Sequence, residues 1–548
     1  MSTQPQSSCR IMHFTKSTSA FGQQIEHLFL IVLSLWMVIL TFCLIESKEN
    51  IFMDEALSYR RACATLPDSD YEFYQTQDDP AEFFQHFFSV NEPFQYDAVY
   101  RNEAVNVHPP LYYYLLHTIC SLFPGHFSLL FAGVINAGFA VGTLWALYGI
   151  LRLLIASRKV RAVLCLLYTL SPGVWNNLSY LRMYVMLGFW VTALTWLFLV
   201  ALKGQIRFYR LRLFLCVYCG ILTHHHFLLF LAASSLTYLI ILILGKDRAT
   251  IFRYICIILS SSICALISFP PMIAQILHSD RGQEAQQNIL AWREYLPRIR
   301  LFLQYSGMDL FGSAHRIVFF LFLICVIIVL WDFFRKGNQL AEYSPSALCI
   351  LVLPIFFYFA AVSISASFTS TRYLYAIYPL LLIIFWLFLY YAILVLLPAH
   401  CIAVPILFFA ATLLTTAAFR CASFPYLYRG DAAKRESLLP YSETDCLYLV
   451  QAENMYVDYF TDYMELSMYG SATVVNAFDT GSPASAFSDR EQLVLVTDEG
   501  YFYQSNNLQA EIMDFCIRNG LPSHIMDLGK FSSETHTYIC SREEKQAE

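Results

Sequence analysis

The sequence predicts an all-α polytopic membrane protein of about eleven transmembrane helices, followed by a small α/β domain at the C-terminal end. Its 548 residues are 57% hydrophobic and only 14% charged, whereas soluble chains average about 25% charged residues. Continuous apolar runs recur along the first three quarters of the chain. Several reach the roughly 20 residues that a helix needs to cross the hydrocarbon. Because the runs do not alternate with period two, they favour helices over a β-barrel.

The first apolar run, at about 27–45, is longer than a signal-peptide core, and no A-x-A-like cleavage site follows it. We therefore expect an uncleaved first transmembrane helix behind an N-terminal tail at 1–26. The other apolar runs lie at about 128–154, 160–178, 183–203, 211–223, 226–245, 252–274, 315–334, 346–366, 372–396 and 400–419.

The placement of Lys and Arg orients these spans, because cytoplasmic loops of membrane proteins carry an excess of both. The clusters are Arg10 and Lys16; Arg152, Arg158, Lys159 and Arg161; Lys203, Arg207, Arg210 and Arg212; Lys246, Arg248 and Arg253; and Arg335 with Lys336. All of them fall on one side if the spans alternate. We therefore expect a multi-pass protein of the cell (plasma) membrane with a cytoplasmic N-terminus. The loops 46–107 and 275–314 and everything after about 420 would lie outside.

The chain changes character after about residue 420, where the long apolar runs stop. Short strand-like runs replace them at 447–451, 472–476, 493–497 and 537–540, with helical periodicity at 508–518. We interpret 421–548 as a small extracytoplasmic α/β domain. Residues 27–420, including the acidic outer loop 46–107, then form the transmembrane domain.

Two classes of partner find no support in the sequence. There is no basic tract interleaved with aromatic residues, so we expect no nucleic acid partner. The 16 cysteines are scattered, without CxxC pairs or Cys/His zinc spacing. Buried cysteines that act as small hydrophobic residues are the better interpretation, although two of Cys446, Cys516 and Cys540 could pair.

Unusual polar residues gather at the predicted outer ends of the spans. They are Asp54, Glu55, His108, Asn176, Asn177, Tyr180, Arg182, the histidines at 224–226, and Arg372 with Tyr373. Loops far apart in sequence are thereby directed at one interface, as a site at the membrane surface requires. Simpler interpretations remain open: solvated loop acids, histidines that cap a helix end, and arginines that reach lipid phosphates. Consecutive histidines point to different faces of a helix, which disfavours a metal site there.

Four short motifs carry a family resemblance. The acid pair in MDEALSY at 53–59, directly after the first predicted helix, resembles the DE motif of type C glycosyltransferases. HPPLYYYLLH at 108–117 looks like the second hallmark of that group, and LRMY at 181–184 and TRY at 371–373, with Pro379, are similar to two further patterns. In this order, over roughly residues 25–400, the motifs resemble glycosyltransferase family 39, the protein O-mannosyltransferase and aminoarabinose transferase superfamily.

The resemblance implies a GT-C-like fold and a hexosyl or pentosyl transfer from a polyprenyl-phosphate-linked donor to an acceptor hydroxyl on the non-cytoplasmic face. Asp54 would be the general base of one inverting displacement, and Glu55 would position the acceptor or Asp54. The donor phosphate would be bound by Arg372, Tyr373, His108 and Arg182, since guanidinium groups bind phosphate with two hydrogen bonds. The residues lining donor or acceptor would be Tyr59, Tyr112, Tyr184, His224 and His225.

The expected partners are the lipid-linked sugar, membrane lipids, and an acceptor protein, lipid or polysaccharide of the cell envelope. Because phosphate is already a good leaving group, no general acid, metal or other cofactor is required; a divalent metal is left open, without a clear ligand set. The sequence departs from the family pattern where relatives carry an acid, since Tyr180-Leu181 stands there. Candidates for a replacement carboxylate are Glu103, Glu284 and Asp309. A second departure is His108, which stands where aminoarabinose transferases commonly have Lys.

A transporter or flippase for lipid-linked sugars is the main alternative, and a non-catalytic relative is another. Ion-coupled transporters usually place ionisable residues or broken helices near the bilayer midplane. The runs 346–366 and 400–419 contain no Asp, Glu, Lys or Arg. This pattern favours the enzyme.

Overall fold

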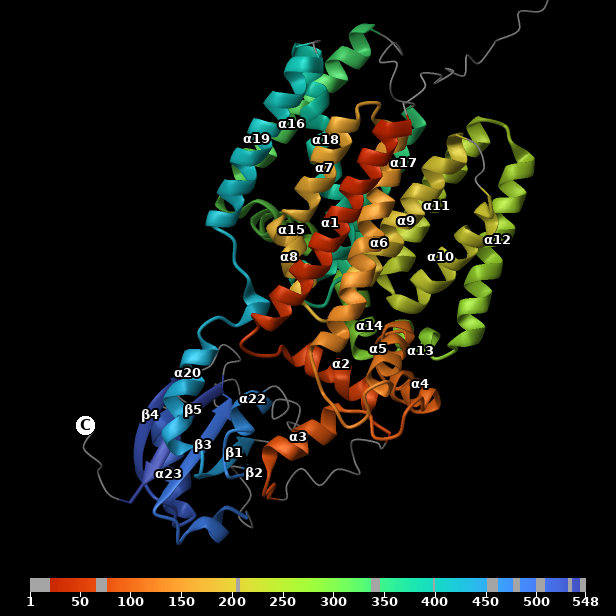
Figure 1. Cartoon of the computed structure of the whole chain (residues 1–548). Helices are drawn as coiled ribbons and strands as arrows, with labels where there is room; N and C mark the ends of the chain where they lie inside the picture. Colours follow the sequence, from red (N-terminus) through yellow and green to blue (C-terminus); the bar gives the residue numbers. More distant parts are fainter. Residues whose placement is uncertain are drawn as a thin grey trace, which may run out of the picture.

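The computed structural model describes residues 20–65, 76–203, 207–336, 345–397, 400–450, 462–476, 483–498, 508–530 and 535–542. A body of long helices stands above a smaller domain built on a sheet, and helices of the predicted outer loop lie between the two (Figure 1). The predicted tail residues up to 19 fall outside the described part of the chain, as do Arg10 and Lys16.

Within these residues, nine helices are long and apolar enough to cross a membrane. The helices concerned are α1 (Ala20–Glu46), α6 (Leu130–Leu154), α9 (Tyr184–Lys203), α11 (His226–Leu244), α12 (Arg248–Ser268), α16 (His315–Lys336), α17 (Pro345–Ser365), α18 (Tyr378–Leu396) and α19 (His400–Arg420). The chain is therefore a multi-pass membrane protein. Helices α9 and α18 lie at the centre of the body, where most of their side chains are buried.

Two predicted spans differ from simple transmembrane helices. The run 160–178 is divided into α7 (Arg158–Thr169) and α8 (Pro172–Ser179). Pro172 starts the second helix, and the extended backbone of Ser171 before it interrupts the first, as a residue preceding proline favours. Helix α10 (Tyr209–Thr223) has 15 residues, or about 22 Å, less than the hydrocarbon thickness. The count of about eleven spans therefore stays a prediction.

The predicted outer loop 46–107 is largely helical. It contains α2 (Met53–Cys63), α3 (Pro80–Phe88) and α4 (Tyr96–Ala104), and α5 (Leu111–Ser121) follows it. Its acids Asp68 and Asp70 lie outside the described residues. The second predicted outer loop, 275–314, is also mostly helical: α13 (Met272–Leu277), α14 (Asp280–Leu290) and α15 (Tyr295–Phe311). Helix α15 packs on α8, α16 and α17, so it belongs to the helical body rather than to an open loop.

The C-terminal part contains a five-stranded sheet with strand order β2-β1-β3-β5-β4. The strands are β1 (Asp445–Val450), β2 (Ser471–Asn476), β3 (Gln492–Asp498), β4 (His524–Lys530) and β5 (Thr535–Ser541). β1 pairs in parallel with β2 and β3, and β5 pairs antiparallel with β3 and β4. Helix α23 (Leu508–Arg518) covers the sheet through Ile512 and Phe515.

This sheet agrees with the α/β interpretation, and four of its strands and its helix fall where the sequence predicts them. The predicted first strand extends one residue farther, to Gln451, which lies outside the described residues. Strand β4 is missing from the prediction because it is an edge strand whose side chains are largely exposed, without clear apolar alternation. Of the three cysteines considered for pairing, Cys516 and Cys540 face each other in the core, with Sγ atoms 3.8 Å apart.

The C-terminal domain contacts the predicted outer loop and the segment after α5 through backbone pairing and aromatic packing. Gln77 and Ala472 exchange backbone hydrogen bonds of 2.8 and 3.0 Å, which continues the sheet beyond β2. The ring of Tyr463 packs edge-on against Phe88, at a centroid distance of 5.4 Å, and against Phe127 at 5.5 Å. The sheet domain therefore lies on the same end of the helical body as α2 and α3 (Figure 1).

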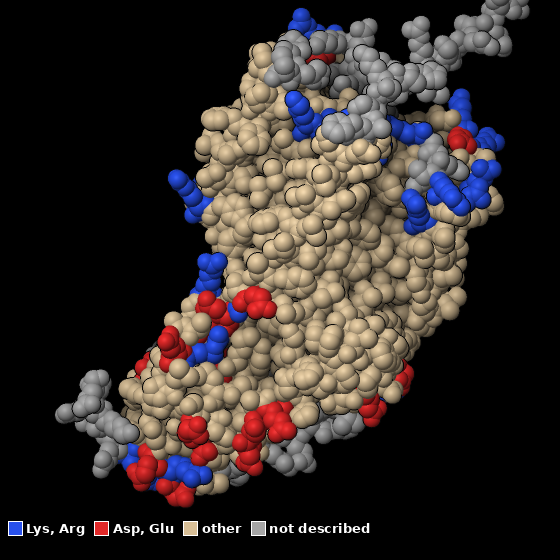
Figure 2. Space-filling model, in the orientation of Figure 1, with Lys and Arg blue, Asp and Glu red and all other residues tan. Residues whose placement is uncertain are grey.

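Charges divide between the two ends of the molecule. Lys and Arg gather at the end of the helical body away from the sheet, and most of the Asp and Glu in this view lie at the other end (Figure 2). The basic end is formed by the turns after α6, α9, α11 and α16. Arg161, at the same end, is buried and forms an ion pair of 2.7 Å with Glu26 of α1.

Candidate active site

The predicted acid pair begins helix α2, at the boundary between the helical body and the outer loop. Glu55 occupies the third helical position, and its Oε2 accepts a hydrogen bond of 2.9 Å from the backbone N–H of Phe52. This contact satisfies one of the free N–H groups at the helix start, where acidic side chains are favoured. Successive helical residues point about 100° apart, so Asp54 and Glu55 face different surroundings.

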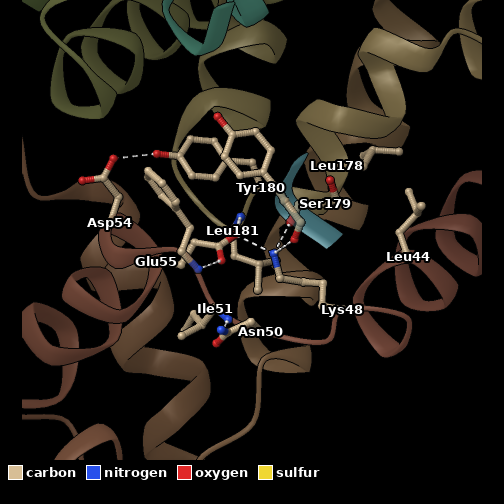
Figure 3. Close-up of polar contacts among 12 residues, drawn as sticks. Leu44, Lys48, Asn50, Ile51, Asp54, Glu55, Leu178, Ser179, Tyr180 and Leu181 are labelled. Atoms are coloured by element: carbon tan, nitrogen blue, oxygen red, sulfur yellow. Dashed lines mark hydrogen bonds and ion pairs between the residues drawn. The ribbon is translucent and has the colours of Figure 1, made fainter. Parts of the chain in front are cut away.

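Glu55 lies in a buried network that joins distant parts of the chain (Figure 3). Its Oε1 accepts hydrogen bonds from Lys48 Nζ at 3.0 Å and from the Leu181 N–H at 2.7 Å. Lys48 also donates to the carbonyl oxygens of Ser179, at 3.0 Å, and Tyr426, at 2.6 Å. Both charged side chains are fully buried. Glu55 therefore connects α2 with the segment after α8, and it faces Lys48 rather than solvent.

Asp54 is the more accessible member of the pair, with 20% of its side chain exposed. Its Oδ2 accepts a hydrogen bond of 2.7 Å from the Tyr180 hydroxyl and forms an ion pair with Arg372 of η5 (Thr371–Ile377). The carbonyl oxygen of Asp54 accepts from Arg182 Nη1 at 2.7 Å. Among the described residues, no hydrogen-bond partner reaches the second carboxylate oxygen, Oδ1.

The charges around Asp54 keep it ionised. Burial raises the pKa of this carboxyl, but Arg182, Arg372 and the hydrogen bond from Tyr180 together lower it more. The net pKa lies below the ordinary value for aspartate. At neutral pH the group is therefore a carboxylate that can accept a proton.

Both arginines at the site keep unused hydrogen-bonding capacity. Arg182 uses Nη1 for the Asp54 carbonyl and for Ser58 Oγ, at 2.8 Å, and Arg372 uses Nη1 for Asp54 and the Tyr180 hydroxyl. In the part of the chain that the structure describes, both Nε atoms are buried without a hydrogen-bond partner. A buried N–H of this kind is costly unless a polar ligand or water pairs with it.

The ring of His108 packs on the ring of His224, with centroids 5.2 Å apart. His224 also contacts Tyr184 at 5.5 Å, so three of the predicted site residues meet. Burial, together with Arg182, Arg372 and the neighbouring histidines, holds the pKa of His108 well below its ordinary value. His108 is therefore uncharged at neutral pH and can offer a hydrogen bond, but no charge, to a phosphate.

The three consecutive histidines lie at the break between two helices: His224 has extended backbone after the end of α10, and His226 begins α11. His225 turns toward Gln275, with 3.1 Å between Nε2 and Oε1. His226 lies next to His224, at a centroid distance of 4.6 Å, and packs on Tyr373 at 5.3 Å. The described residues contain no group of three or more His, Cys, Asp or Glu side chains arranged to hold a metal ion.

Two of the predicted lining residues have structural contacts. The Tyr59 hydroxyl donates to the Ser128 carbonyl at 2.8 Å and accepts from the Ala132 N–H at 3.0 Å. The Tyr112 hydroxyl donates to the Leu181 carbonyl at 2.9 Å. Both side chains are fully buried. They hold α2 and α5 in place around the site.

The sequence reasoning missed three contributors: Lys48, Tyr426 and the role of Tyr180. A lysine on the predicted outer side of the first span departs from the positive-inside rule, and this signal could have drawn attention to Lys48. Tyr426 carries no such signal. Of the candidate replacement acids, Glu103 and Asp309 are buried in networks of their own, with Asn106 and Tyr378, and Glu284 pairs with Arg281 on the surface.

The fold is similar to that of known membrane glycosyltransferases. The chain superposes on ArnT, the aminoarabinose transferase, from Cupriavidus metallidurans in the apo state with a TM-score of 0.50 and 11% identity, covering 96% of this chain and 99% of that chain. The chain has the type C glycosyltransferase fold. This fold confirms the GT-C-like architecture that the motifs suggested.

Two further solved structures are similar at lower scores. ArnT from the same organism bound to undecaprenyl phosphate has a TM-score of 0.48 at 11% identity, covering 95% of this chain and 98% of that chain. The apo oligosaccharyltransferase of Archaeoglobus fulgidus has a TM-score of 0.48 at 12% identity, covering 90% of this chain and 72% of that chain. No protein-family model and no curated protein matches the sequence.

Proposed function

We propose that this type C protein is a membrane glycosyltransferase that moves a sugar from a polyprenyl-phosphate-linked donor to an acceptor hydroxyl on the non-cytoplasmic face. The observation that carries the proposal is an ionised carboxylate, Asp54, bordered by two arginines whose Nε atoms have no hydrogen-bond partner among the described residues. Carboxylate and paired guanidinium groups are the two elements that transfer from a sugar phosphate requires: a proton acceptor and an anion site.

The proposed reaction is one displacement with inversion. The acceptor oxygen attacks the anomeric carbon from the face opposite the phosphate, and its proton passes to Asp54. The bond between the anomeric carbon and the phosphate oxygen breaks, and its electron pair leaves with the phosphate. Arg372 and Arg182 stabilise the negative charge that the departing phosphate gains.

Donor binding would also make Asp54 a stronger proton acceptor. In the structure Arg182 and Arg372 hold the pKa of Asp54 low, which makes it a weak proton acceptor. An anionic phosphate beside the two guanidinium groups offsets their charge, so the pKa of Asp54 rises when the donor is bound. The base then gains strength when a sugar is present to be transferred.

The likeness of the fold to apo ArnT supports this donor class; ArnT has also been solved bound to undecaprenyl phosphate. Because the arginines carry the positive charge, the proposed reaction requires no metal ion. His108 and His224 would contact the donor as uncharged hydrogen-bonding groups. The acceptor is a protein, lipid or polysaccharide hydroxyl.

We propose a cytoplasmic N-terminus in the plasma membrane, with the site and the C-terminal domain outside. The basic turns after α6, α9, α11 and α16 support this orientation, because they lie at the end away from α2, the helix that carries Asp54 (Figures 1 and 2). The proposed division of the chain is a tail at 1–26, a transmembrane domain at 27–420 and an extracytoplasmic domain at 421–548.

The test uses purified full-length protein with a panel of polyprenyl-phosphate sugars and compares wild type with Asp54→Asn. We expect turnover with at least one donor, and a loss of about 10²–10⁴-fold in the variant, as for removal of a general base. Asp97→Asn is the matched control, because Asp97 is an exposed outer-loop acid paired with Arg101. Transfer that survives in Asp54→Asn contradicts the mechanism. Donor binding without turnover by wild type would favour a transporter or a binding protein.

A further inference from the structure

Tyr180 stands where the resemblance leads one to expect an acid, and its hydroxyl contacts the proposed base directly. It donates a 2.7 Å hydrogen bond to Asp54 Oδ2 (Figure 3). It also accepts one of 3.1 Å from Arg372 Nη1. The hydroxyl therefore lies between the proposed proton acceptor and one of the proposed phosphate ligands. No other hydroxyl donates to the Asp54 carboxylate among the described residues.

The Tyr180 ring is held in one orientation. It is fully buried and stacks on Tyr426, with centroids 4.2 Å apart and an angle of 15° between the planes. Tyr184 stacks on it at 5.6 Å and 18°, and Phe52 packs edge-on at 5.8 Å. A ring packed among three others keeps its hydroxyl in place, so little side-chain entropy opposes the bond to Asp54.

The backbone around Tyr180 is fixed as well. Its carbonyl oxygen accepts a hydrogen bond of 3.0 Å from Asn136 Nδ2 of α6. The next N–H, of Leu181, donates to Glu55. Glu55 thus acts on Asp54 indirectly, because it holds the segment that carries the tyrosine.

We propose that Tyr180 is a positioning residue for the reaction: its hydroxyl holds Oδ2 of Asp54 so that Oδ1 is directed at the acceptor hydroxyl. This inference rests on the proposed function. The tyrosine is needed most when the donor is bound, because the phosphate then competes with Asp54 for Arg372, whereas the Tyr180 hydroxyl can still donate its hydrogen bond to Asp54. A neutral hydroxyl can hold the Asp54 carboxylate by a hydrogen bond. An ionised second acid at this position would repel Asp54, because adjacent carboxylates carry like charges.

Asp54 lies among several titratable or charged groups, and the test has to separate Tyr180 from them. The groups with an electrostatic influence on Asp54, or influenced by it, are Arg182, Arg372, Arg281, Tyr180, Tyr113, Tyr184, Tyr426 and Tyr428. Only Tyr180 among these tyrosines donates a hydrogen bond to the carboxylate. A Tyr180→Phe substitution removes that bond and retains the stacked ring.

The experiment measures kcat against pH for wild type, Tyr180→Phe and Tyr378→Phe. A hydrogen bond to a carboxylate lowers its pKa, so its removal should move the acid side of the Tyr180→Phe profile to higher pH by about one unit. Tyr378→Phe is the matched control, because it removes a buried hydrogen bond of 2.9 Å to another carboxylate, Asp309. We expect that profile to keep its position on the pH axis.

A second variant tests the role of the Tyr180 hydroxyl in case Tyr180→Phe does not fold. Replacing Tyr180 with 3-fluorotyrosine keeps the ring and makes the hydroxyl a stronger donor, so the acid side should move to lower pH. An unchanged acid side in both variants, with transfer that still requires Asp54, overturns the role of Tyr180 and leaves the proposed function intact. Transfer that is independent of Asp54 overturns the proposed function itself.

Discussion

At the scale of single residues, two neighbouring acids of one helix have different roles because of their contacts. Glu55 is buried against Lys48 and backbone N–H groups, whereas Asp54 is partly exposed between arginines. A third acid, Glu103 of α4, is buried with one oxygen bonded to Asn106 Nδ2 at 2.8 Å. Burial raises the pKa of Glu103 to about 8. Environment rather than residue type therefore decides which of these carboxyl groups is charged.

The raised pKa of Glu103 predicts a stability change with pH. Unfolded, this acid ionises near its ordinary pKa, but in the folded protein it stays protonated up to about pH 8. Its stabilising contribution is therefore present below about pH 4.5 and is lost as the pH rises toward 8. We expect Glu103→Gln to denature a few degrees higher than wild type at pH 9 and at a similar temperature at pH 5, measured by thermal unfolding in detergent. The exposed Glu92→Gln should match wild type at both values; a Glu103→Gln difference that does not change with pH would contradict the assignment.

At the scale of elements, the site is a junction. The end of α1, the start of α2, the end of α8 and the short helix η6 (Pro425–Leu427) meet at the Lys48 ammonium group, which donates to Glu55, Ser179 and Tyr426. None of these elements can move alone without breaking a buried charged hydrogen bond. The junction therefore gives Asp54 a rigid support.

Removing Lys48 should be far more harmful than removing an exposed lysine or arginine. In Lys48→Met the Glu55 carboxylate loses its buried counter-ion, and we expect a loss of stability of about 3–5 kcal/mol with a fall in transfer activity. The double variant Lys48→Met with Glu55→Gln should recover part of that stability. Arg101→Met, which breaks an exposed pair with Asp97, should cost at most about 1 kcal/mol. Denaturant or thermal unfolding of the four proteins measures this, and equal losses in the two single variants would show that the Lys48 junction is not special.

At the scale of the whole molecule, the helices alternate in direction between a basic end and an end that carries the site. α6 and α9 both finish at the basic end, so α7 and α8 together must return the chain between them. α11 also ends at the basic end, so α10 must return the chain to the site end between α9 and α11. Both short elements pack on long helices of the body, α7 on α1 and α6, and α10 on α9 and α12.

This alternation predicts an odd number of crossings. Epitope tags at the N-terminus and after Gly245, in the turn between α11 and α12, should be protected from protease in sealed right-side-out vesicles. A tag at the C-terminus should be cleaved in the same vesicles, and permeabilised vesicles serve as the control for tag accessibility. Protection of all three tags, or of the C-terminal tag alone, would refute the proposed orientation.

The sequence by itself determined the features that depend on local composition. Apolar length predicts the membrane helices, and the placement of Lys and Arg marks the basic turns. The order of the motifs indicates the type C fold. It also drew attention to Asp54, Arg182, His108 and Arg372. The tertiary structure brings both arginines into contact with Asp54, and His108 lies within electrostatic reach of the two arginines.

Tertiary structure alone decided what each of these residues contacts, because hydrogen-bond partners come from chain segments hundreds of residues apart. Tyr426 and Lys48 are separated by 378 positions, and Arg372 and Asp54 by 318. Edge strand β4 and the break at Pro172 were missed for a related reason: side-chain exposure and helix ends depend on neighbours rather than on apolar periodicity. In the sequence, Tyr180 marks the loss of a carboxylate that relatives carry. Only the structure shows that its ring is packed among three aromatic rings and that its hydroxyl donates to Asp54.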